Sequence, residues 1–417
     1  MFAAVFNLHA ESLDVRQLGE ASDVKLFGDT GRAAFVCSNA GSSAAPEETG
    51  AIHSLGGRYW IVGLIRLDAP RELQARLAAE IGNPPKAIPD ALLCLHAYAK
   101  WGDRFVEFLA GDFAFALWDD ERQSLIAVRD QMGVRLLFHA RKANTWFVSD
   151  SLDWIAARAS TGRELDDYWI ADFLTTGCSR EFERTVYRDI QRLAPAHVIR
   201  LGDNGATLRS YWRLSIVEPI HFRDPRVYAE RLLELLSFAI ADRLPAGRVG
   251  ISMSGGLDST TLAACTLDTT GDAARIIAEC EHYEEVMHIR EDYFASLAAR
   301  RLGIDLSIRV MDNLVYDPQW RSRGIRSAEP TISLLNAHNL RQIDGDHARA
   351  AAVWFEGEGP DNALTLERNS YLNWLFRRRS WGRLAGALFQ YARVKGAAGW
   401  AQTFRRHAGQ GRHAGQE

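Results

Sequence analysis

The sequence predicts an α/β protein with two unlike parts, a layered antiparallel part followed by a part with a parallel sheet. Of its 417 residues, 47% are hydrophobic and 24% are charged, which is typical of a globular protein with room for two or three domains. Up to about residue 210, short apolar runs are separated by glycine and polar turns, a pattern typical of antiparallel strands. After residue 225, apolar runs alternate with helical patterns, which indicates β-α-β units and a parallel sheet.

The first part contains strand-like runs and two helical stretches. We expect strands at residues 2–6, 33–37, 59–65, 113–118, 125–128, 146–148 and 197–201. Helices are expected at residues 69–81 and 90–101, the second with a rough 3.6-residue apolar period. The pattern loosens between Arg209 and Pro225, where we place the domain boundary, so the first domain spans residues 1–215.

The second part, residues 216–405, begins with an expected helix at residues 226–243. Strands are expected at residues 248–253, 275–280, 306–310 and 351–355, and helices at residues 259–267, 290–302 and 332–343. In such a sheet, ligands bind beyond the carboxyl ends of the strands. The tail, residues 406–417, is rich in Gly, His, Gln and Arg and is expected to be disordered.

The charge and the cysteines exclude several classes of function. The net charge of −4 gives no overall basic field, so we expect no nucleic-acid partner, although the stretch from Arg377 onward is locally basic. The first eight residues lack the basic start of a signal peptide, and no window approaches the roughly 18 apolar residues of a membrane span. We therefore expect a cytoplasmic protein with no membrane partner. The five cysteines form no C-x-x-C pair, which argues against a disulfide framework and a structural zinc site.

The stretch Val249-Gly-Ile-Ser-Met-Ser-Gly-Gly-Leu-Asp-Ser-Thr-Thr261 predicts an anion site. An apolar strand that turns through Gly255 and Gly256 into a helix leaves backbone N–H groups at the helix N-terminus pointing outward, where they attract phosphate. Three hydroxyls add donors for a bound pyrophosphate: Ser254, Ser259 and Thr260.

A carboxylate in the same stretch indicates a cation. Asp258 would repel phosphates unless a cation lies between them, and Mg²⁺ is the cation that suits oxygen ligands and phosphates. The G-x-x-x-x-G-K-[ST] pattern is absent, which argues against a loop of the kind that transfers a γ-phosphate.

The hexapeptide Ser-Gly-Gly-Leu-Asp-Ser259 resembles the signature of the ATP pyrophosphatases, which split ATP between its α and β phosphates and adenylate a substrate. The segment Glu356-Gly-Glu-Gly-Pro-Asp-Asn362 is similar to the Ser-Gly-Glu-Gly-x-Asp-Glu segment of the asparagine synthetase family. Residues 109–119, 128–133 and 148–150 resemble the amidotransferase-like N-terminal domain of that family, and residues 192–197 its closing strand. The resemblance covers roughly residues 1 to 370. It implies a layered αββα, Ntn hydrolase-like domain of the glutamine amidotransferase type 2 kind, followed by a parallel-sheet ATP pyrophosphatase (adenine nucleotide α-hydrolase-like) domain.

The N-terminus departs from the family pattern. In glutamine-hydrolysing members, the residue after the initiator methionine is a cysteine whose own α-amine acts as the base. Here it is Phe2, which cannot attack an amide, and the family's glutamine-binding Asn-Gly-Glu turn is replaced by Gly63-Leu-Ile65. Asp90 corresponds to the acidic position that recognises the amine of glutamine. We therefore expect an amidotransferase-like domain without glutaminase activity.

The second half also departs from the pattern. The resemblance implies an essential lysine well past the Gly-Glu-Gly segment, and extrapolation puts it beyond Glu417. Lys395 is the one lysine after residue 142, in a basic helical stretch that is more typical of a solvated face. We therefore expect the second domain to be truncated.

The resemblance assigns roles to the motif residues. Asp258 and Asp361 would hold Mg²⁺ on the triphosphate of ATP, and Glu358 would take a proton from the attacking amine. Asp292, like Asp90, is a weaker candidate for a substrate contact. The residues expected around ATP and its pyrophosphate are Met253, Ser254, Gly255, Gly256, Asp258, Ser259, Thr260, Glu279, Glu356 and Gly357.

The predicted function is ATP-dependent amide ligation. The enzyme would activate a small-molecule or peptide carboxylate as an acyl-adenylate, release AMP and pyrophosphate, and couple the acid to ammonia or an amine. Two alternatives stay open. One is an intramolecular cyclase similar to β-lactam synthetases and the macrolactam-forming enzymes of lasso peptides, favoured by Asn362-Ala-Leu in place of the usual Glu-x-Phe. The other is a non-catalytic binding or assembly subunit, and a homodimer is also left open.

Overall fold

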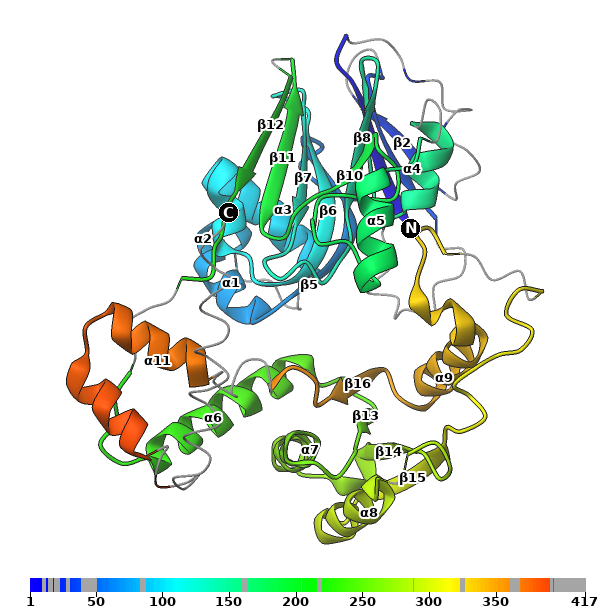
Figure 1. The fold of residues 1–417 in the computed structure, drawn as a ribbon. Coiled ribbons are helices and arrows are strands. Elements are labelled where there is room, and N and C mark those ends of the chain that lie inside the picture. Colours follow the sequence, from blue (N-terminus) through cyan, green and yellow to red (C-terminus); the bar gives the residue numbers. More distant parts are fainter. Residues whose placement is uncertain are drawn as a thin grey trace.

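The structure is a computed structural model in which two parts are built on different kinds of sheet (Figure 1). It describes the whole chain except residues 10–12, 14–17, 19–22, 28–30, 39–50, 83–87, 160–163, 204, 216–219, 288, 323–326, 361–367, 391–392 and 394–417. Asp361, Lys395 and the tail at residues 406–417 therefore lie outside the described residues.

The first part is a sandwich of two antiparallel sheets. In spatial order, the first sheet consists of β10 (Ile190–Arg192), β8 (Phe138–Lys142), β9 (Thr145–Ser149), β1 (Phe2–Asn7), β3 (Ala33–Cys37) and β2 (Asp23–Phe27). The second consists of β12 (Gly205–Ser210), β11 (His197–Gly202), β7 (Ser124–Arg129), β6 (Gly111–Asp119), β5 (Tyr59–Leu67) and β4 (His53–Leu55).

Helices cover both outer faces of this sandwich, as Figure 1 shows. The helices α1 (Pro70–Arg76), α2 (Ala78–Ile81) and α3 (Asp90–Trp101) lie against the second sheet, and α4 (Leu152–Arg158) lies against the first; α5 (Asp167–Thr176) follows α4.

Three hydrophobic cores separate the four layers. Phe113, Phe115 and Leu117 of β6 pack against the helices on their side, whereas Phe2 and Phe6 meet Trp118 between the sheets. A third core joins β1 and β3 to α4. All six residues of β1 are buried because both of its faces are covered, which explains why this strand is a continuous apolar run. The predicted αββα layering is confirmed.

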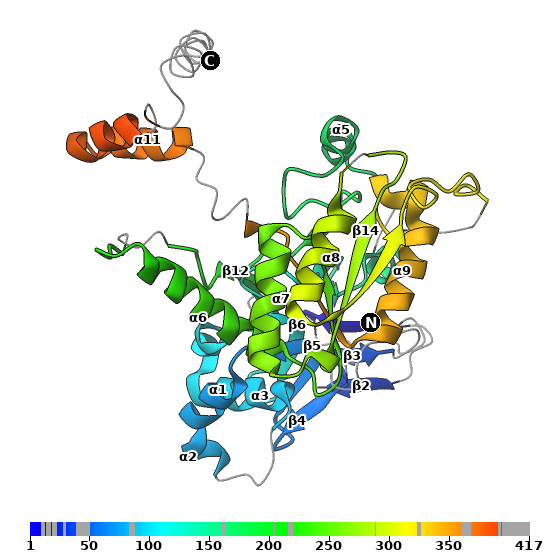
Figure 2. The same cartoon turned by 90° about the horizontal axis from the view of Figure 1, so that it is seen from below.

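The second part contains a four-stranded parallel sheet in the order β15 (Asp305–Val310), β14 (Ile276–His282), β13 (Val249–Ser252) and β16 (Val353–Glu356). Its core lies between this sheet and the helices α7 (Leu257–Thr270) and α8 (Glu291–Leu302), which run side by side in Figure 2. The helix α9 (Ala337–Ala350) contacts the opposite face, and this part also contains the helices α6 (Arg226–Arg243) and α11 (Arg368–Arg377). The predicted parallel sheet is confirmed.

The strand order of the parallel sheet reverses between the neighbouring strands β13 and β16. From β13 the chain proceeds outward to β14 and β15, and then returns to add β16 on the other side of β13. The order therefore reverses between β13 and β16, and ligands in such sheets bind at this reversal, outside the carboxyl ends of the strands. The two glycine-containing motifs follow these two strands.

A cluster of charged side chains attaches α6 to the first part. The Asp242 carboxylate accepts a hydrogen bond from the backbone N–H of Ala69 at 3.0 Å. The Arg66 guanidinium lies against Asp68 and donates to Asp112 at 3.1 Å, and Arg243 of α6 pairs with Asp68 at 3.1 Å. These contacts join the end of β5 and the start of β6 to the second part.

Several elements differ from the predictions. The helix expected at residues 69–81 is divided at buried Leu77, whose backbone leaves the helical region, into α1 and α2. The helix expected at residues 332–343 begins as a 3-10 turn, Ile332–Asn336, and continues as α9 to Ala350. The strands and α-helices that the sequence patterns missed are β2, β4, β8, β10, β12, α4, α5 and α11. Among the described residues, no helix is long and apolar enough to cross a membrane.

Candidate functional site

The chain leaves β13 through a tight loop and enters α7 at Leu257. Gly255 has a φ of +76°, and a Cβ there would collide with the backbone of Phe294 and Ala295 on α8, so glycine is needed on both counts. The Ser254 and Ser259 hydroxyls lie 3.2 Å apart, and the Gly256 N–H donates to Ser254 Oγ at 3.3 Å. Hydrogen bonds within the loop therefore hold its two ends together, and Gly255 packs directly against α8.

The start of α7 offers free donors. Gly256 is the N-cap residue and has no side chain to cap the helix. The N–H of Thr260 donates to the Gly256 carbonyl at 3.1 Å, whereas the N–H groups of the preceding first turn have no acceptor within the helix. Thr260 Oγ1 is buried and forms no hydrogen bond with the described residues. These donors and the helix dipole make the turn suitable for an anion.

The loop after β16 touches this turn. Ser252 of β13 is in register with Glu356 of β16, so both strands end at the same level. A Cβ on Gly357 would lie 2.9 Å from the Ser259 N and 3.1 Å from its Cα, so glycine at this position keeps the Ser259 N–H accessible. Glu358 follows with an exposed side chain, and Gly359 has a φ of +98°. The two sequence motifs are thus in contact at the reversal of strand order.

Asp258 lies in the first turn of α7, half-buried. No described residue forms an ion pair with its carboxylate. The part of the chain that the structure describes contains no group of three or more potential metal-ligating side chains. Mg²⁺ is typically bound through one or two carboxylates, substrate phosphates and water, so a single carboxylate beside a turn suited to an anion is compatible with it. The second predicted ligand, Asp361, lies outside the described residues.

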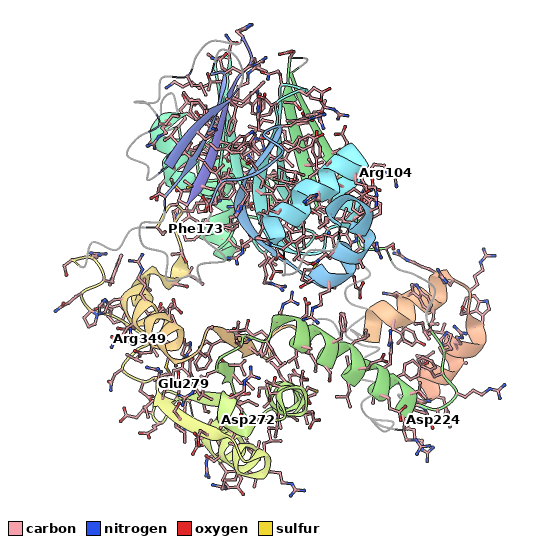
Figure 3. All side chains as sticks on the ribbon, turned by 180° about the vertical axis from the view of Figure 1, so that it is seen from behind. Arg104, Phe173, Asp224, Asp272, Glu279 and Arg349 are labelled. Carbon is pink, nitrogen blue, oxygen red and sulfur yellow. The ribbon has the colours of Figure 1, made fainter. Side chains whose placement is uncertain are left out.

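Glu279, expected near the adenine, is bound on the opposite face of the sheet from α7. Its backbone carbonyl accepts from the Met253 N–H at 2.8 Å, but its carboxylate receives Arg309 Nε at 2.8 Å and Nη2 at 2.9 Å. His347 Nε2 lies 2.9 Å from Glu279 Oε1. Burial raises the pKa of the Glu279 carboxyl, but these two partners outweigh it and hold the pKa below its usual value. Figure 3 labels Glu279 near α9, the helix that carries Arg349.

A second glutamate on this face was not predicted as a site residue. Glu281 follows Glu279 by two positions on β14, so both side chains point to the same face. The Glu281 side chain is exposed overall, but partial desolvation of its carboxyl, followed by the nearby charges of Glu279 and Glu356, raises its pKa. The two-residue spacing of Glu279 and Glu281 is the sequence feature that could have indicated that they share a face of the sheet. No local pattern indicates Arg309 or His347.

The two weaker candidates, Asp292 and Asp90, lie at the starts of two helices in different parts of the protein. Asp292 lies in the first turn of α8, with His282 Nδ1 at 3.9 Å and Arg290 Nε at 3.6 Å from its Oδ1. That oxygen is buried and has no hydrogen-bond partner among the described residues. Asp90 begins α3, and its carboxylate accepts from the backbone N–H of Leu67 at 2.7 Å, so it joins α3 to β5.

Phe2 is completely buried at the start of β1, among the side chains between the two sheets. Its N–H donates to Asp150 Oδ1 at 2.8 Å, and its carbonyl accepts from Ser149 Oγ at 2.7 Å. Burial raises the pKa of the Asp150 carboxyl. Gly63-Leu-Ile65, aligned with the family's glutamine-binding turn, is part of the continuous strand β5.

The family model described as "Glutamine amidotransferase domain" matches residues 69–212. "Asparagine synthetase [glutamine-hydrolyzing] 3" of Bacillus subtilis is 27% identical over 199 residues, which cover 47% of this chain and 31% of that protein. "Amidase chyE" of Penicillium rubens is 25% identical over 291 residues, covering 65% of this chain and 42% of that protein. The chain therefore spans about a third to two fifths of the length of these relatives.

Two solved structures are also similar in part. An allosteric regulatory enzyme of purine biosynthesis is 11% identical with a TM-score of 0.34, over 85% of this chain and 89% of that one. An NH3-dependent NAD synthetase from Campylobacter jejuni is 14% identical with a TM-score of 0.25, over 34% of this chain and 60% of that one. Residues 69–212 thus match a glutamine amidotransferase domain, and the chain is similar to asparagine synthetases over a little less than half of its length.

Proposed function

We propose that this protein binds Mg-ATP where the loops after β13 and β16 meet, and uses it to activate a carboxylate as an acyl-adenylate that then forms an amide. The contact between Gly357 and Ser259 carries this proposal, because it brings the two motifs together at the reversal of strand order. The relationship to asparagine synthetases supports it.

The loop and the first turn of α7 would hold the pyrophosphate end of ATP. The backbone N–H groups of this turn, together with the hydroxyls of Ser254, Ser259 and Thr260, supply donors to phosphate oxygens. Asp258 and Asp361 would hold Mg²⁺, which neutralises phosphate charge when it is bound. Attack of the substrate carboxylate on the α-phosphorus of ATP then releases pyrophosphate and leaves the acyl-adenylate.

Glu358 is proposed to act in the second step. Its exposed side chain follows Gly357 directly. It therefore lies beside residues 254–260, the proposed phosphate turn, without belonging to it. The nitrogen that attacks the acyl-adenylate must lose a proton as the amide forms, and a nearby carboxylate can accept it. AMP then leaves.

The nitrogen is proposed to come from free ammonia or an amine, because the amidotransferase-type domain presents no nucleophile at the start of β1. Phe2 is a buried hydrocarbon whose backbone is bonded to Asp150 and Ser149. The cytoplasmic location and the homodimer stay predictions.

We accordingly predict that the protein releases no glutamate from glutamine, because a phenyl ring cannot attack the amide. Glutamate is measured with and without the protein, in the presence of Mg-ATP, with ammonium chloride as the parallel nitrogen source. Release of glutamate above the protein-free control would show that another nucleophile hydrolyses glutamine.

A second candidate function, intramolecular amide formation, is favoured by the apolar surface beside the phosphate turn. Leu257 is 88% exposed at the start of α7, and Tyr293 and Phe294 of α8 are also exposed, as is Ile289 before it. A peptide with apolar side chains would cover this surface, whereas a small polar acid would leave it in water. The products distinguish the two functions: a cyclised substrate has lost one water, whereas an amidated one carries a new nitrogen.

Replacing Gly357 by alanine should weaken Mg-ATP binding about 10- to 100-fold, because the added methyl crowds the Ser259 N–H and leaves a phosphate oxygen poorly paired. Calorimetric titration with Mg-ATP measures this. The control is Gly386→Ala, where a Cβ meets nothing within 4 Å and φ is not positive. Equal affinity in both variants would mean that phosphates do not bind near the Ser259 N–H.

A further inference from the structure

Residues 327–336, which lead into α9, contact the first part of the protein through Glu329. The Glu329 carboxylate accepts from Arg192 Nη2 at 2.6 Å and from the backbone N–H of Val186 at 3.0 Å. Arg192 and Glu329 are only 16% and 20% exposed, so this charged pair is largely shielded from water and from salt. Ala328 packs on the core beneath α4.

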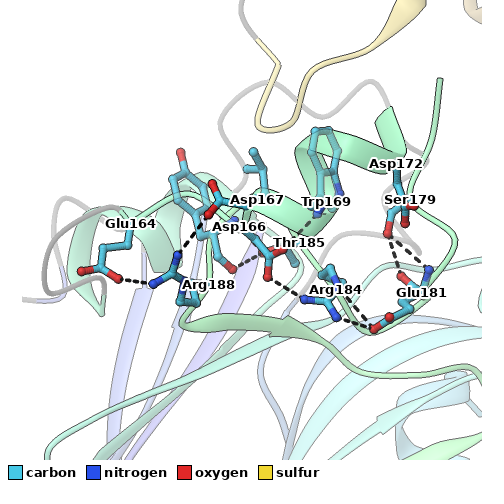
Figure 4. Close-up of polar contacts among 12 residues, drawn as sticks. Glu164, Asp166, Asp167, Trp169, Asp172, Ser179, Glu181, Arg184, Thr185 and Arg188 are labelled. Atoms are coloured by element: carbon cyan, nitrogen blue, oxygen red, sulfur yellow. Dashed lines mark hydrogen bonds and ion pairs between the residues drawn. The ribbon is translucent and has the colours of Figure 1, made fainter. Parts of the chain in front are cut away.

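The surface that receives Glu329 is held in place by its own polar contacts (Figure 4). Asp166 caps α5 by accepting from the Trp169 N–H at 2.9 Å, and it pairs with Arg184 at 2.8 Å. Thr185 Oγ1 donates to the Ile190 carbonyl at 2.8 Å, and Arg192 also donates to the Phe182 carbonyl at 3.1 Å. The positions of Val186 and Arg192 are therefore held by contacts within the first part of the protein, in addition to those with Glu329.

The residues that follow β15 also contact the start of α9 and the turn before it. Asn339 of α9 donates from Nδ2 to the Leu314 carbonyl at 3.0 Å, and the Asp317 N–H donates to the Leu335 carbonyl at 2.9 Å. These bonds join the start of α9 and the residue Leu335 before it to residues 314–317. A displacement of residues 327–336 therefore displaces the helix.

α9 in turn holds the strands next to the phosphate turn. His347 contacts Glu279 on β14, and its ring stacks on Trp354 of β16 with 3.9 Å between centroids and 22° between planes. Trp354 Nε1 donates to the His347 carbonyl at 2.9 Å. Glu279 and Trp354 lie on the two strands that flank β13. Contacts thus run continuously from Glu329 to both neighbours of the strand that leads into the phosphate turn.

We infer that Glu329 is a positioning residue: by clamping residues 327–336 to Arg192 and Val186, it uses the amidotransferase-type domain to hold α9, and through α9 the strand ends that form the nucleotide site. This inference rests on the proposed function for the identity of the nucleotide. In this inference, the amidotransferase-type domain, which lacks the family's nucleophile, serves to hold α9 in position. The charge cluster around Arg66 and Asp242 attaches α6 and takes no part in these contacts.

The test compares Glu329→Gln with Glu164→Gln in the full chain. The glutamine introduced by Glu329→Gln would be neutral toward Arg192. Glu164 forms a 3.0 Å pair with Arg188 on the same surface (Figure 4) and forms no ion pair or side-chain hydrogen bond with the described residues 327–336. Glu329→Gln should raise the Kd for Mg-ATP roughly 3- to 10-fold, since partly buried charge pairs contribute on that scale. It should also speed amide hydrogen exchange in α9 about tenfold. Glu164→Gln should change neither quantity.

A double-mutant cycle tests whether the effect passes through α9. His347→Gln should weaken Mg-ATP binding, and its combination with Glu329→Gln should be much less than additive, because both break one series of contacts. Additive effects, or an unchanged Mg-ATP affinity in Glu329→Gln, would overturn the inference. If Glu329→Gln does not fold, Glu329→Asp keeps the charge and shortens its reach, and the same outcomes apply.

Hydrogen exchange in α9 separates this inference from the proposed function. The hydrogen-exchange measurement requires neither a substrate acid nor catalysis. Unchanged α9 exchange in Glu329→Gln would overturn the clamp even if the wild type forms acyl-adenylates. Conversely, wild-type protein that forms no acyl-adenylate, but whose α9 exchange and Mg-ATP affinity depend on Glu329, would overturn the reaction and support the clamp.

Discussion

Replacing Asp258 by asparagine should weaken Mg-ATP binding by about 10- to 100-fold or more, as expected for the loss of a charged ligand beside a triphosphate. The carboxylate lies in the first turn of α7 and forms no ion pair with a described residue, so no other described charge is positioned to replace it. Isothermal titration calorimetry in excess Mg²⁺ measures the affinity.

The matched control for this variant is Asp268→Asn, near the far end of the same helix, where the side chain is exposed. It should bind Mg-ATP as the wild type does. The affinity of Asp258→Asn should also become less sensitive to the Mg²⁺ concentration. An unchanged affinity in Asp258→Asn would count decisively against a cation at this turn.

Replacing Glu358 by glutamine should stop amide formation while leaving Mg-ATP binding and slow release of AMP or pyrophosphate in place. Glutamine keeps the shape of the side chain but cannot accept the proton of the attacking nitrogen, and general bases commonly contribute about 10²- to 10⁴-fold to rate. Amide product and pyrophosphate are measured in the same reaction, so that the two steps are separated.

Glu285→Gln, on the exposed loop before α8, is the control for a lost carboxylate near the same edge of the sheet. It should make amide at the wild-type rate. If Glu358→Gln instead loses nucleotide binding, Glu358 belongs to the phosphate and metal site. If it makes amide at the parent rate, another group is the base.

Features with a local cause could be predicted from the sequence. The strands β1, β6 and β13 are continuous apolar runs because they are covered on both faces. The Gly255 turn could be predicted because a positive φ and close backbone approach both require glycine there. The contact of Gly357 with Ser259 followed from the resemblance of two motifs, which pointed to one site.

Features that depend on distant contacts could not be predicted. Strands such as β8 and β12 carry charged residues and are held by pairing with their hairpin partners rather than by an apolar pattern of their own. The side-chain partners of Glu279 could not be predicted, because its carboxylate binds Arg309 and His347, which lie 30 and 68 positions further along the chain. Glu329 meets Arg192 across 137 positions, and neither residue stands in a pattern that marks the pair.

The most direct test of the proposed site is a crystal structure of the protein with Mg²⁺ and α,β-methylene-ATP, an analogue that cannot be split between its α and β phosphates. We predict that the β and γ phosphates accept hydrogen bonds from the first-turn N–H groups of α7, including that of Ser259, with the cation beside Asp258. The α-phosphate should lie on the side of Glu358. A nucleotide bound elsewhere, for example in the groove between α6 and α7 lined by Arg231, Phe238 and Asp268, would contradict the proposed site.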